Sequence, residues 1–212
     1  MKLIIGLGNP GSKYKNNRHN LGFIIIDAYV SKFGLEWAYS RDWICFWAKN
    51  ENALFIKPST FMNKSGAAVK AVADFYKVDL KDILVISDEV DLPFSKIRLA
   101  FDGLSAGHKG VDSVIQYIGG FEFARLRIGV GSPRRASSEA GSPRRASSEA
   151  GRPSHPILDS GSKVKVPDVA DYVLEDFSKE ERQKLDEVIL KCQEALSSYI
   201  AEGIEATMNR FN

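Results

Sequence analysis

The sequence predicts an α/β fold: a single domain built on a twisted mixed sheet with helices on both faces. Two observations predict it. Continuous apolar runs at residues 3–7 and 83–86 are typical of strands that are buried on both faces. Segments with helical periodicity, such as residues 20–33 and 67–76, alternate with the strands, as in α/β sheets. Since 212 residues can bury a sizeable core without disulfides, we expect one domain over residues 1–212.

The first strand leads into the stretch that we expect to organise the protein. The apolar run at 3–7 enters a turn at 8–11, and the helix at 20–33 begins only after a further polar stretch. Ligands of open α/β sheets bind beyond the carboxyl ends of the strands. We therefore expect Asn9 and His19 to face one cleft.

The glycine pattern of residues 6–11 matches the dinucleotide-binding fingerprint. That fingerprint requires a helix to open at the turn, so that the helix N-terminus meets the pyrophosphate. Here Pro10 and the polar residues 12–17 delay the helix. Asp27, which follows about 20 residues later where an acid should hold the ribose, falls inside the helix itself. The context therefore disfavours a nucleotide-binding protein.

The rest of the chain continues the alternation of strands and helices. The strand at 83–86 ends in Ser87-Asp88-Glu89, again at a carboxyl edge of the sheet. A capping box at residues 178–181 begins a long helix whose apolar residues share one face, and we interpret this helix as structural. The remaining strands are expected at residues 37–39, 43–48, 53–56, 96–99 and 126–130, and a further helix at residues 108–118.

Cysteine usage and hydropathy point to the compartment. Cys45 and Cys192 lie far apart in apolar surroundings, and we interpret them as reduced core residues. No apolar run approaches the length of a transmembrane helix, and no basic and apolar leader precedes the first strand. We therefore expect a soluble, cytoplasmic protein with no membrane partner.

Residues 131–140 and 141–150 carry the same decapeptide, GSPRRASSEA, in tandem. The repeat offers nothing to bury, so we expect a disordered insert at 131–150 that interrupts the domain. Such perfect identity favours an engineered insertion over a recent natural duplication, and each copy contains Arg-Arg-Ala-Ser, which resembles the site of basophilic protein kinases. The insert carries four arginines and two glutamates, which account for the net charge of +2. Only a local basic patch could therefore argue for nucleic-acid binding.

Several long motifs, in order along the chain, resemble those of bacterial peptidyl-tRNA hydrolases. The match covers nearly the whole chain apart from the insert, and it is far more specific than the glycine pattern alone. The motifs are residues 6–11 with Tyr14 and Arg18-His19-Asn20, residues 57–66, residues 88–93, Gly107-His108-x-Gly110 and residues 125–129. The resemblance implies a monomeric enzyme that hydrolyses the ester between a peptide and the 3′ ribose of its tRNA, and that binds the acceptor stem and 3′ end of peptidyl-tRNA.

Five residues could carry this chemistry. Ester cleavage by water requires a base and donors that hold the developing oxyanion. His19 is the natural base because imidazole titrates near neutral pH, and Asp88 could fix its tautomer, as in a catalytic triad. Asn9 and Asn63 offer amides to a carbonyl or a peptide backbone, and Met62 offers an adaptable apolar wall. The family assigns these positions similar roles.

Each assignment has a structural alternative when the residues are considered alone. His19 could be a solvated or capping residue, and Asn9 could serve only its turn. Asp88 could cap the next element, and Met62 could belong to the core. His108 could cap its helix, pack or take part in catalysis.

No metal or cofactor is expected. The three histidines, His19, His108 and His155, lack the spacing of metal ligands and have no cysteine nearby.

Cations near the predicted site could bind the phosphates of the acceptor stem. Arg98, Arg125 and Arg127 are the main candidates, with Lys96 and Lys109 beside them, although an ordinary solvated face is the alternative. Separately, Tyr14 could stack on the terminal base or support its loop.

The sequence departs from the family at two positions. Lys109 stands where the family usually has Asn, which is thought to help hold the water or the peptide, and an ammonium group cannot accept a hydrogen bond. We keep Lys109 as a candidate for substrate binding. Phe94-Ser95 stands where the family commonly has a glycine.

A second hypothesis is a non-catalytic RNA-binding relative with the same fold. The presence of Asn9, His19 and Asp88 together favours the enzyme.

Deleting residues 131–150 should leave turnover and melting temperature almost unchanged. The repeat has no large apolar residue, and the entropy of loop closure grows only slowly with loop length. Thermal unfolding and a peptidyl-tRNA turnover assay on both chains would test this, and a large loss in either would show that the insert packs or binds tRNA.

Overall fold

The structure is a computed structural model that describes residues 1–133 and 168–212. The predicted insert at 131–150 therefore lies outside the described residues, apart from residues 131–133.

Strands that pair in parallel form the centre of the sheet, as expected for apolar runs buried on both faces. Their Cα registers join Ile4 to both Phe55 and Leu84, and Ile86 to Leu126. In spatial order the central strands are β4 (Ala53–Pro58), β1 (Lys2–Gly6), β5 (Ile83–Glu89) and β7 (Ala124–Gly129).

Antiparallel strands complete the sheet on both sides. Beyond β4 lie β3 (Cys45–Lys49) and β2 (Ala38–Ser40), and beyond β7 lies β6 (Ile97–Phe101). The full order is β2-β3-β4-β1-β5-β7-β6. This mixed sheet confirms the predicted fold class.

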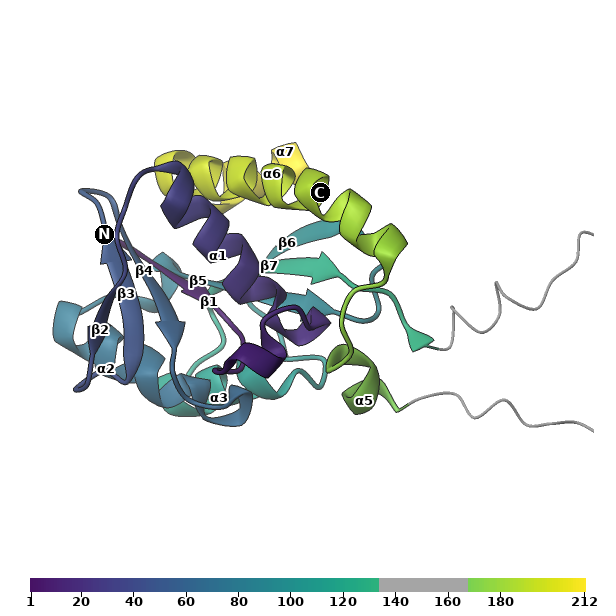
Figure 1. Cartoon of the computed structure of the whole chain (residues 1–212). Helices are drawn as coiled ribbons and strands as arrows, with labels where there is room; N and C mark the ends of the chain where they lie inside the picture. The colour runs from purple at the N-terminus through teal and green to yellow at the C-terminus, as the bar shows by residue number, and fades with distance from the viewer. Residues whose placement is uncertain (134–167) are drawn as a thin grey trace, which may run out of the picture.

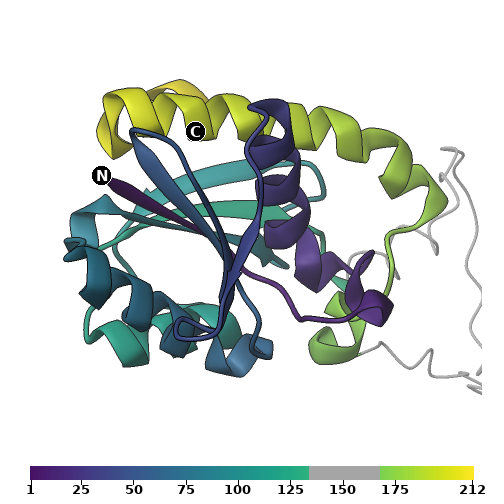
Figure 2. The same cartoon turned by 60° about the vertical axis from the view of Figure 1, so that its left-hand side comes forward.

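Helices cover both faces of the sheet (Figures 1 and 2). One face carries α1 (Leu21–Lys32) and α6 (Lys179–Glu202), and the other carries α2 (Ser65–Tyr76) and α3 (Lys109–Ile118). The three predicted helices and the long capped helix are confirmed, with small differences at their ends. Among the described residues, two short α-helices were not predicted: α5 (Val169–Val173) and α7 (Ile204–Phe211).

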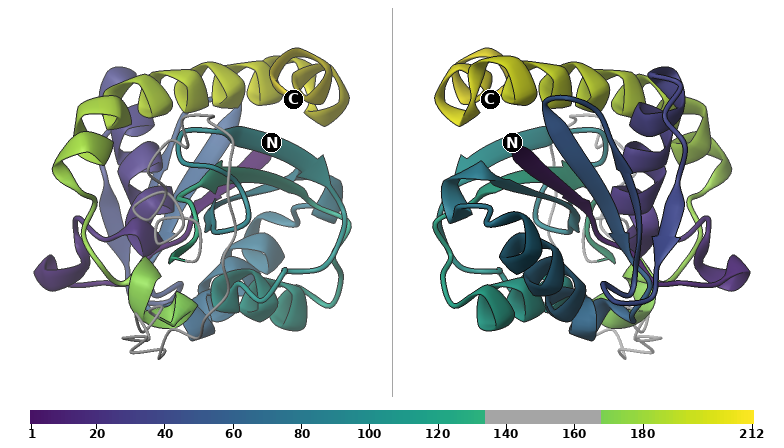
Figure 3. Two further views of the ribbon diagram at one scale, coloured as in Figure 1. Left: turned by 90° about the vertical axis from the view of Figure 1, so that its right-hand side faces the viewer. Right: turned by 90° about the vertical axis from the view of Figure 1, so that its left-hand side faces the viewer.

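Two apolar layers hold the helices to the sheet. The sheet lies between the two groups of helices (Figure 3). Successive residues of β1 alternate between the layers: Ile4 packs under α1 and α6, whereas Leu3 and Ile5 face the side of α2 and α3. Burying one such side chain stabilises the fold by about 1.5–3 kcal/mol. Layers that clamp both faces therefore leave the strand ends as the place where polar groups can gather.

Both cysteines belong to these layers, as predicted. Cys45 and Cys192 are fully buried thiols, and burial raises the pKa of each to about 12. They are therefore poor nucleophiles. In the part of the chain that the structure describes, every helix is too short or too polar to cross a bilayer.

The glycines of the misleading fingerprint serve packing. A Cβ atom on Gly6 would lie 2.5 Å from the carbonyl oxygen of Gly22, and one on Gly8 would lie 2.6 Å from the ring of Phe23. These glycines let the start of α1 approach β1 closely. Because α1 begins only at Leu21, its N-terminus does not open at the glycine turn.

Of the five non-glycine residues with positive φ in the described part of the chain, two bear on the sequence predictions. Ile44 has φ 51°, which explains why β3 begins at Cys45 rather than at the predicted residue 43. Ser95 has φ 70°. It stands where the family commonly has a glycine, and glycine adopts this conformation without steric cost.

The outer strand β6 is hydrogen-bonded to Asn212, the residue that follows α7. The side-chain amide of Asn212 accepts a hydrogen bond from the backbone N–H of Leu99 (2.8 Å) and donates one to the carbonyl oxygen of Leu99 (2.9 Å). One side chain thus satisfies both backbone groups of Leu99.

Gly66→Ala should lower the free energy of unfolding by about 2–4 kcal/mol, although alanine favours helices. At Gly66 a Cβ atom would lie 2.1 Å from the carbonyl oxygen of Ser113 in α3, which would force α2 and α3 apart. Urea unfolding at constant m-value would measure the loss. Ala67→Gly is the control and should cost about 1 kcal/mol through helix propensity alone. An unchanged or higher stability of Gly66→Ala would contradict the close contact.

Candidate active site

The site is organised by η2 (Arg18–Asn20), a single 3-10 turn that joins the loop after β1 to α1. Its three side chains make separate contacts. Asn20 bonds to the loop after β1, His19 bonds to the end of β5, and Arg18 bonds to Glu181 in the first turn of α6. Since Arg18 and Asn20 are almost fully buried, their polar groups require partners.

An amide pair fixes the loop that carries Asn9. The backbone N–H of Asn9 donates to Oδ1 of Asn20 (2.8 Å), and Nδ2 of Asn20 donates to the carbonyl oxygen of Asn9 (2.9 Å). In turn, Oδ1 of Asn9 accepts from the backbone N–H of Met62 (2.9 Å). The Asn9 amide is thereby oriented with its oxygen engaged. Its Nδ2 group has no partner among the described residues and is left to donate to a ligand.

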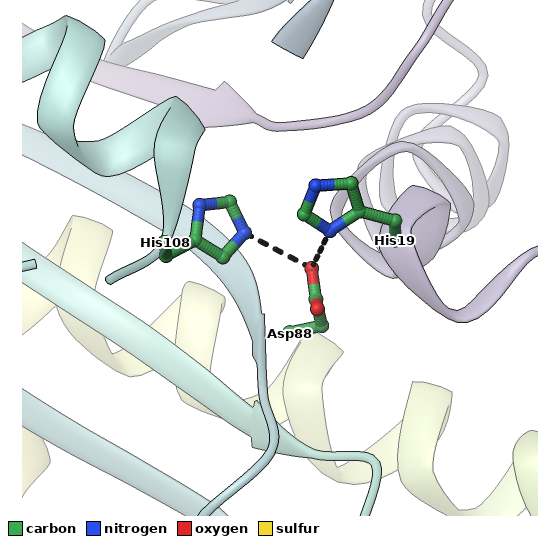
Figure 4. A group of neighbouring side chains, drawn as sticks. All are labelled: His19, Asp88 and His108. Atoms are coloured by element: carbon green, nitrogen blue, oxygen red, sulfur yellow. Dashed lines mark hydrogen bonds and ion pairs between the residues drawn. The ribbon is translucent and has the colours of Figure 1, made fainter. Parts of the chain in front are cut away.

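His19 and Asp88 form the predicted pair (Figure 4). Nδ1 of His19 lies 2.9 Å from Oδ1 of Asp88, which stands near the end of β5. Burial alone would raise the pKa of Asp88, but His108 and His19 together lower it well below its usual range. The carboxylate is therefore ionised and accepts the Nδ1 proton of His19. Nε2 of the same ring is left as a free proton acceptor.

A second imidazole contacts the same carboxylate oxygen. Nε2 of His108 lies 3.0 Å from Oδ1 of Asp88. Nδ1 of His108 caps α3, accepting from the backbone N–H groups of Gly110 (3.1 Å) and Val111 (3.3 Å). Because Nδ1 accepts, the neutral ring carries its proton on Nε2 and donates it to Asp88. The capping role considered from the sequence is confirmed. Burial lowers the pKa of His108, but Asp88, together with a backbone hydrogen bond and Glu89, raises it overall.

The donor set fits a metal ion poorly. The ligand atoms of His19, Asp88 and His108 lie within 4.8 Å of one another, and they form the one such group found in the described residues. A ligating histidine almost always donates its second N–H to an acceptor. In His108 the second nitrogen, Nδ1, faces the backbone N–H groups of Gly110 and Val111. A metal on Nε2 would put the ring proton on Nδ1, where it would point at these two donors and find no acceptor. His155 lies outside the described residues.

A cavity of about 440 Å³ opens beside the pair. Met62 fits both of the roles considered from the sequence, since its side chain lines the cavity and is also buried in the core. Asn63 and Lys109 are exposed and also line the cavity, whereas Tyr14 lies on η1 (Ser12–Tyr14) and does not. Further lining residues that we did not anticipate are Phe61 and, around α5, Val169, Val173 and Leu174.

The three predicted tRNA-contacting arginines do not form one exposed patch. Arg98 is exposed on β6 and pairs in register with Arg127 on β7. Arg127 donates through Nε (2.8 Å) and Nη2 (2.5 Å) to Oε2 of Glu89. Arg125 requires a correction, since it is buried and its guanidinium donates to the carbonyl oxygens of Leu104 (2.6 Å) and Asp102 (2.5 Å). It braces the loop before α3 and is not part of a basic surface.

Sequence reasoning missed two features of the site. The bond between His108 and Asp88 joins residues of different elements, and only the order of the strands brings them together. The wall around α5 gave no signal, because a helix of five residues is too short to show periodicity.

An imidazole held by a buried carboxylate, beside an amide donor and an apolar cavity at the carboxyl ends of parallel strands, is typical of hydrolases that activate water. The chain belongs to the peptidyl-tRNA hydrolase family, whose model matches residues 3–141 and 159–212.

Similar sequences and a similar crystal structure match the chain over its whole length. It is 38% identical to a peptidyl-tRNA hydrolase of Exiguobacterium sibiricum over 215 residues, which cover 100% of both proteins. It is 40% identical to that of Pseudothermotoga lettingae over 214 residues, which cover 100% of this chain and 97% of the relative. The crystal structure of peptidyl-tRNA hydrolase from Acinetobacter baumannii superposes with a TM-score of 0.78 at 29% identity, covering 100% of this chain and 94% of that one.

Asp88→Asn should lower kcat by roughly 10⁴-fold while the fold is retained. The Asn amide would donate toward Nδ1 of His19, which favours the tautomer whose Nε2 carries the proton and cannot act as a base. Steady-state kinetics with a circular dichroism control would measure the effect. Activity within tenfold of the parent would mean that Asp88 does not set the tautomer.

Proposed function

We propose that the chain hydrolyses the ester between the peptide and the 3′ ribose of peptidyl-tRNA, with His19 as general base on water. The observation that carries this proposal is the bond between His19 and Asp88, which leaves Nε2 of His19 as an acceptor at the cavity. Membership of the family supplies the substrate class.

The reaction follows from the positions of these groups. Nε2 of His19 takes a proton from water, and the oxygen attacks the ester carbonyl carbon. The negative charge that develops on the carbonyl oxygen is stabilised by the free Nδ2 group of Asn9. The intermediate then breaks the bond to the 3′ oxygen, which receives the proton from the His19 imidazolium. The products are a peptide with a free carboxyl group and a tRNA with a free 3′ hydroxyl.

The other cavity residues would bind and orient the substrate. The amide of Asn63 would bond the peptide backbone, and Met62 with Phe61 would supply apolar surface for a side chain, since all three line the cavity. Lys109 would add a cation to the lining of the cavity. Each of these residues lines the same space as His19.

The acceptor stem would bind along the side of the sheet formed by β6 and β7. Lys96 and Arg98 are exposed there, and Nη1 of Arg127 has no partner among the described residues. Because Glu89 already holds Nε and Nη2 of Arg127, the guanidinium is pre-oriented to bind a phosphate. Tyr14, which lies outside the cavity, would stack on the terminal base of the 3′ end.

One copy of the chain supplies all of these groups, so the proposed enzyme acts as a monomer, without a cofactor, in the cytoplasm where tRNA is reused. The non-catalytic RNA-binding alternative makes a different prediction: binding of peptidyl-tRNA without turnover. A single assay of peptidyl-tRNA cleavage distinguishes the two.

His19→Ala should reduce turnover by roughly 10²–10⁴-fold, the usual contribution of a general base. Folding should be little affected because the ring lies at the cavity. Near-normal turnover in a folded variant would remove His19 from the mechanism.

Lys109→Asn should stay active but bind peptidyl-tRNA more weakly at low salt, because the substitution removes a cation from the lining of the cavity. KM measured for both proteins over a series of salt concentrations would test this, and the salt dependence should be steeper in the parent. An equal salt dependence in the two proteins would mean that Lys109 does not contact a phosphate.

A further inference from the structure

Arg18 is a buried cation that stands directly before the proposed base but faces away from the cavity. Its guanidinium grips Glu181 with two bonds, from Nη2 to Oε2 (2.7 Å) and from Nε to Oε1 (3.4 Å). Nη1 donates to the carbonyl oxygen of Tyr172 (3.3 Å) and to Oε2 of Glu175 (3.4 Å). This forked, planar geometry is one that lysine cannot reproduce.

The same guanidinium holds the wall of the cavity. Its central carbon lies 4.3 Å from the centre of the Tyr172 ring, a cation–π contact, and Tyr172 belongs to α5. The hydroxyl of Tyr172 donates to the carbonyl oxygen of Val130 after β7 (2.7 Å). Val173 and Leu174, which follow Tyr172 directly, line the cavity. Arg18 thus determines where this apolar wall stands.

Backbone bonds tie the wall to the turn as well. The N–H of Arg18 donates to the carbonyl oxygen of Glu175 (3.1 Å), and the Asn17 side chain donates to the carbonyl oxygen of Leu174. Because η2 is a single turn of three residues, a shift of Arg18 is transmitted to His19. The bond from His19 to Asp88 is the contact that such a shift would lengthen.

We infer that Arg18 is a positioning residue that sets two parts of the site together: the imidazole of His19 and the wall around α5. The inference rests on the proposed function and adds a residue that touches neither water nor substrate. It also predicts that the two effects separate: loss of the Arg18–Glu181 pair impairs kcat and KM, whereas loosening α5 alone impairs KM.

The main test is Glu181→Gln. Its amide oxygen, in the place of Oε2, can still accept from the backbone N–H of Ser178, which closes the capping box of α6, and from Nη2 of Arg18. The pair would lose the negative charge of the glutamate, and the NH₂ group, in the place of Oε1, would face the Nε–H donor of Arg18. We expect kcat to fall about 10- to 100-fold, the effect of misplacing a catalytic group by about 1 Å, together with a higher KM. The matched control is Ser178→Ala, which removes the cap alone and should change kcat less than about twofold.

Tyr172→Phe separates the wall from the base. It keeps the ring against Arg18 but loses the bond to Val130, so KM should rise about 3- to 10-fold while kcat stays within about twofold, as expected for a loss of uniform binding. If Glu181→Gln does not fold, Arg18→Lys replaces it. Lysine keeps the positive charge that balances Glu175 and Glu181 but lacks the planar, forked guanidinium, so this variant should lower kcat by a similar factor.

A readout that needs no turnover is the imidazole N–H proton of His19 in the NMR spectrum. It should appear downfield in the parent and in Ser178→Ala, and shift or broaden in Glu181→Gln. Glu181→Gln with unchanged kcat and an unchanged His19 signal, whatever its melting temperature, would overturn the inference. A parent that does not cleave peptidyl-tRNA would overturn the proposed function instead, and the NMR comparison would still decide whether Arg18 positions His19.

Discussion

The site depends on one constraint: the turn at residues 18–20 must satisfy two buried side chains while it presents a third. A buried guanidinium and a buried amide are costly unless every donor and acceptor is paired. Arg18 finds its partners in α5, in the first turn of α6 and in the segment between them, and Asn20 finds them on the loop after β1. Because both neighbours of His19 are held in this way, the imidazole has little freedom to leave Asp88.

The sheet supplies the second half of this arrangement. The parallel strands β1 and β5 end at the same edge, so the loop with Asn9 and the carboxylate of Asp88 arrive side by side. From the opposite layer, α3 brings His108 to the same carboxylate oxygen, and the cap on α3 decides which nitrogen of that ring carries the proton. Packing energy, which is spread over many apolar side chains, thus fixes the positions of a few polar atoms.

Much of the fold and of the site could be predicted from the sequence, because the candidate residues follow apolar runs that are recognisable as strands. Apolar runs gave the central strands, and the position of Asp88 after one of them placed it near His19. Other features depend on distant partners. Arg125 looked like a surface cation, yet the loop at Asp102 buries it, and no local pattern encodes a contact between loop and strand. The wall around α5 similarly exists through bonds to residues far away in the chain, such as Val130.

The amide of Asn212 has a consequence for the outer strand of the sheet. An outer strand offers unpaired N–H and C=O groups, and such an edge is a template on which another chain can add a strand. At Leu99 the Asn212 side chain takes the place of that missing neighbour, because its oxygen and nitrogen imitate the acceptor and donor of a peptide group. On the opposite edge, β2 has three residues and offers little length for pairing. The mixed sheet therefore resists edge-to-edge association at both of its margins, and it does so without closing into a barrel.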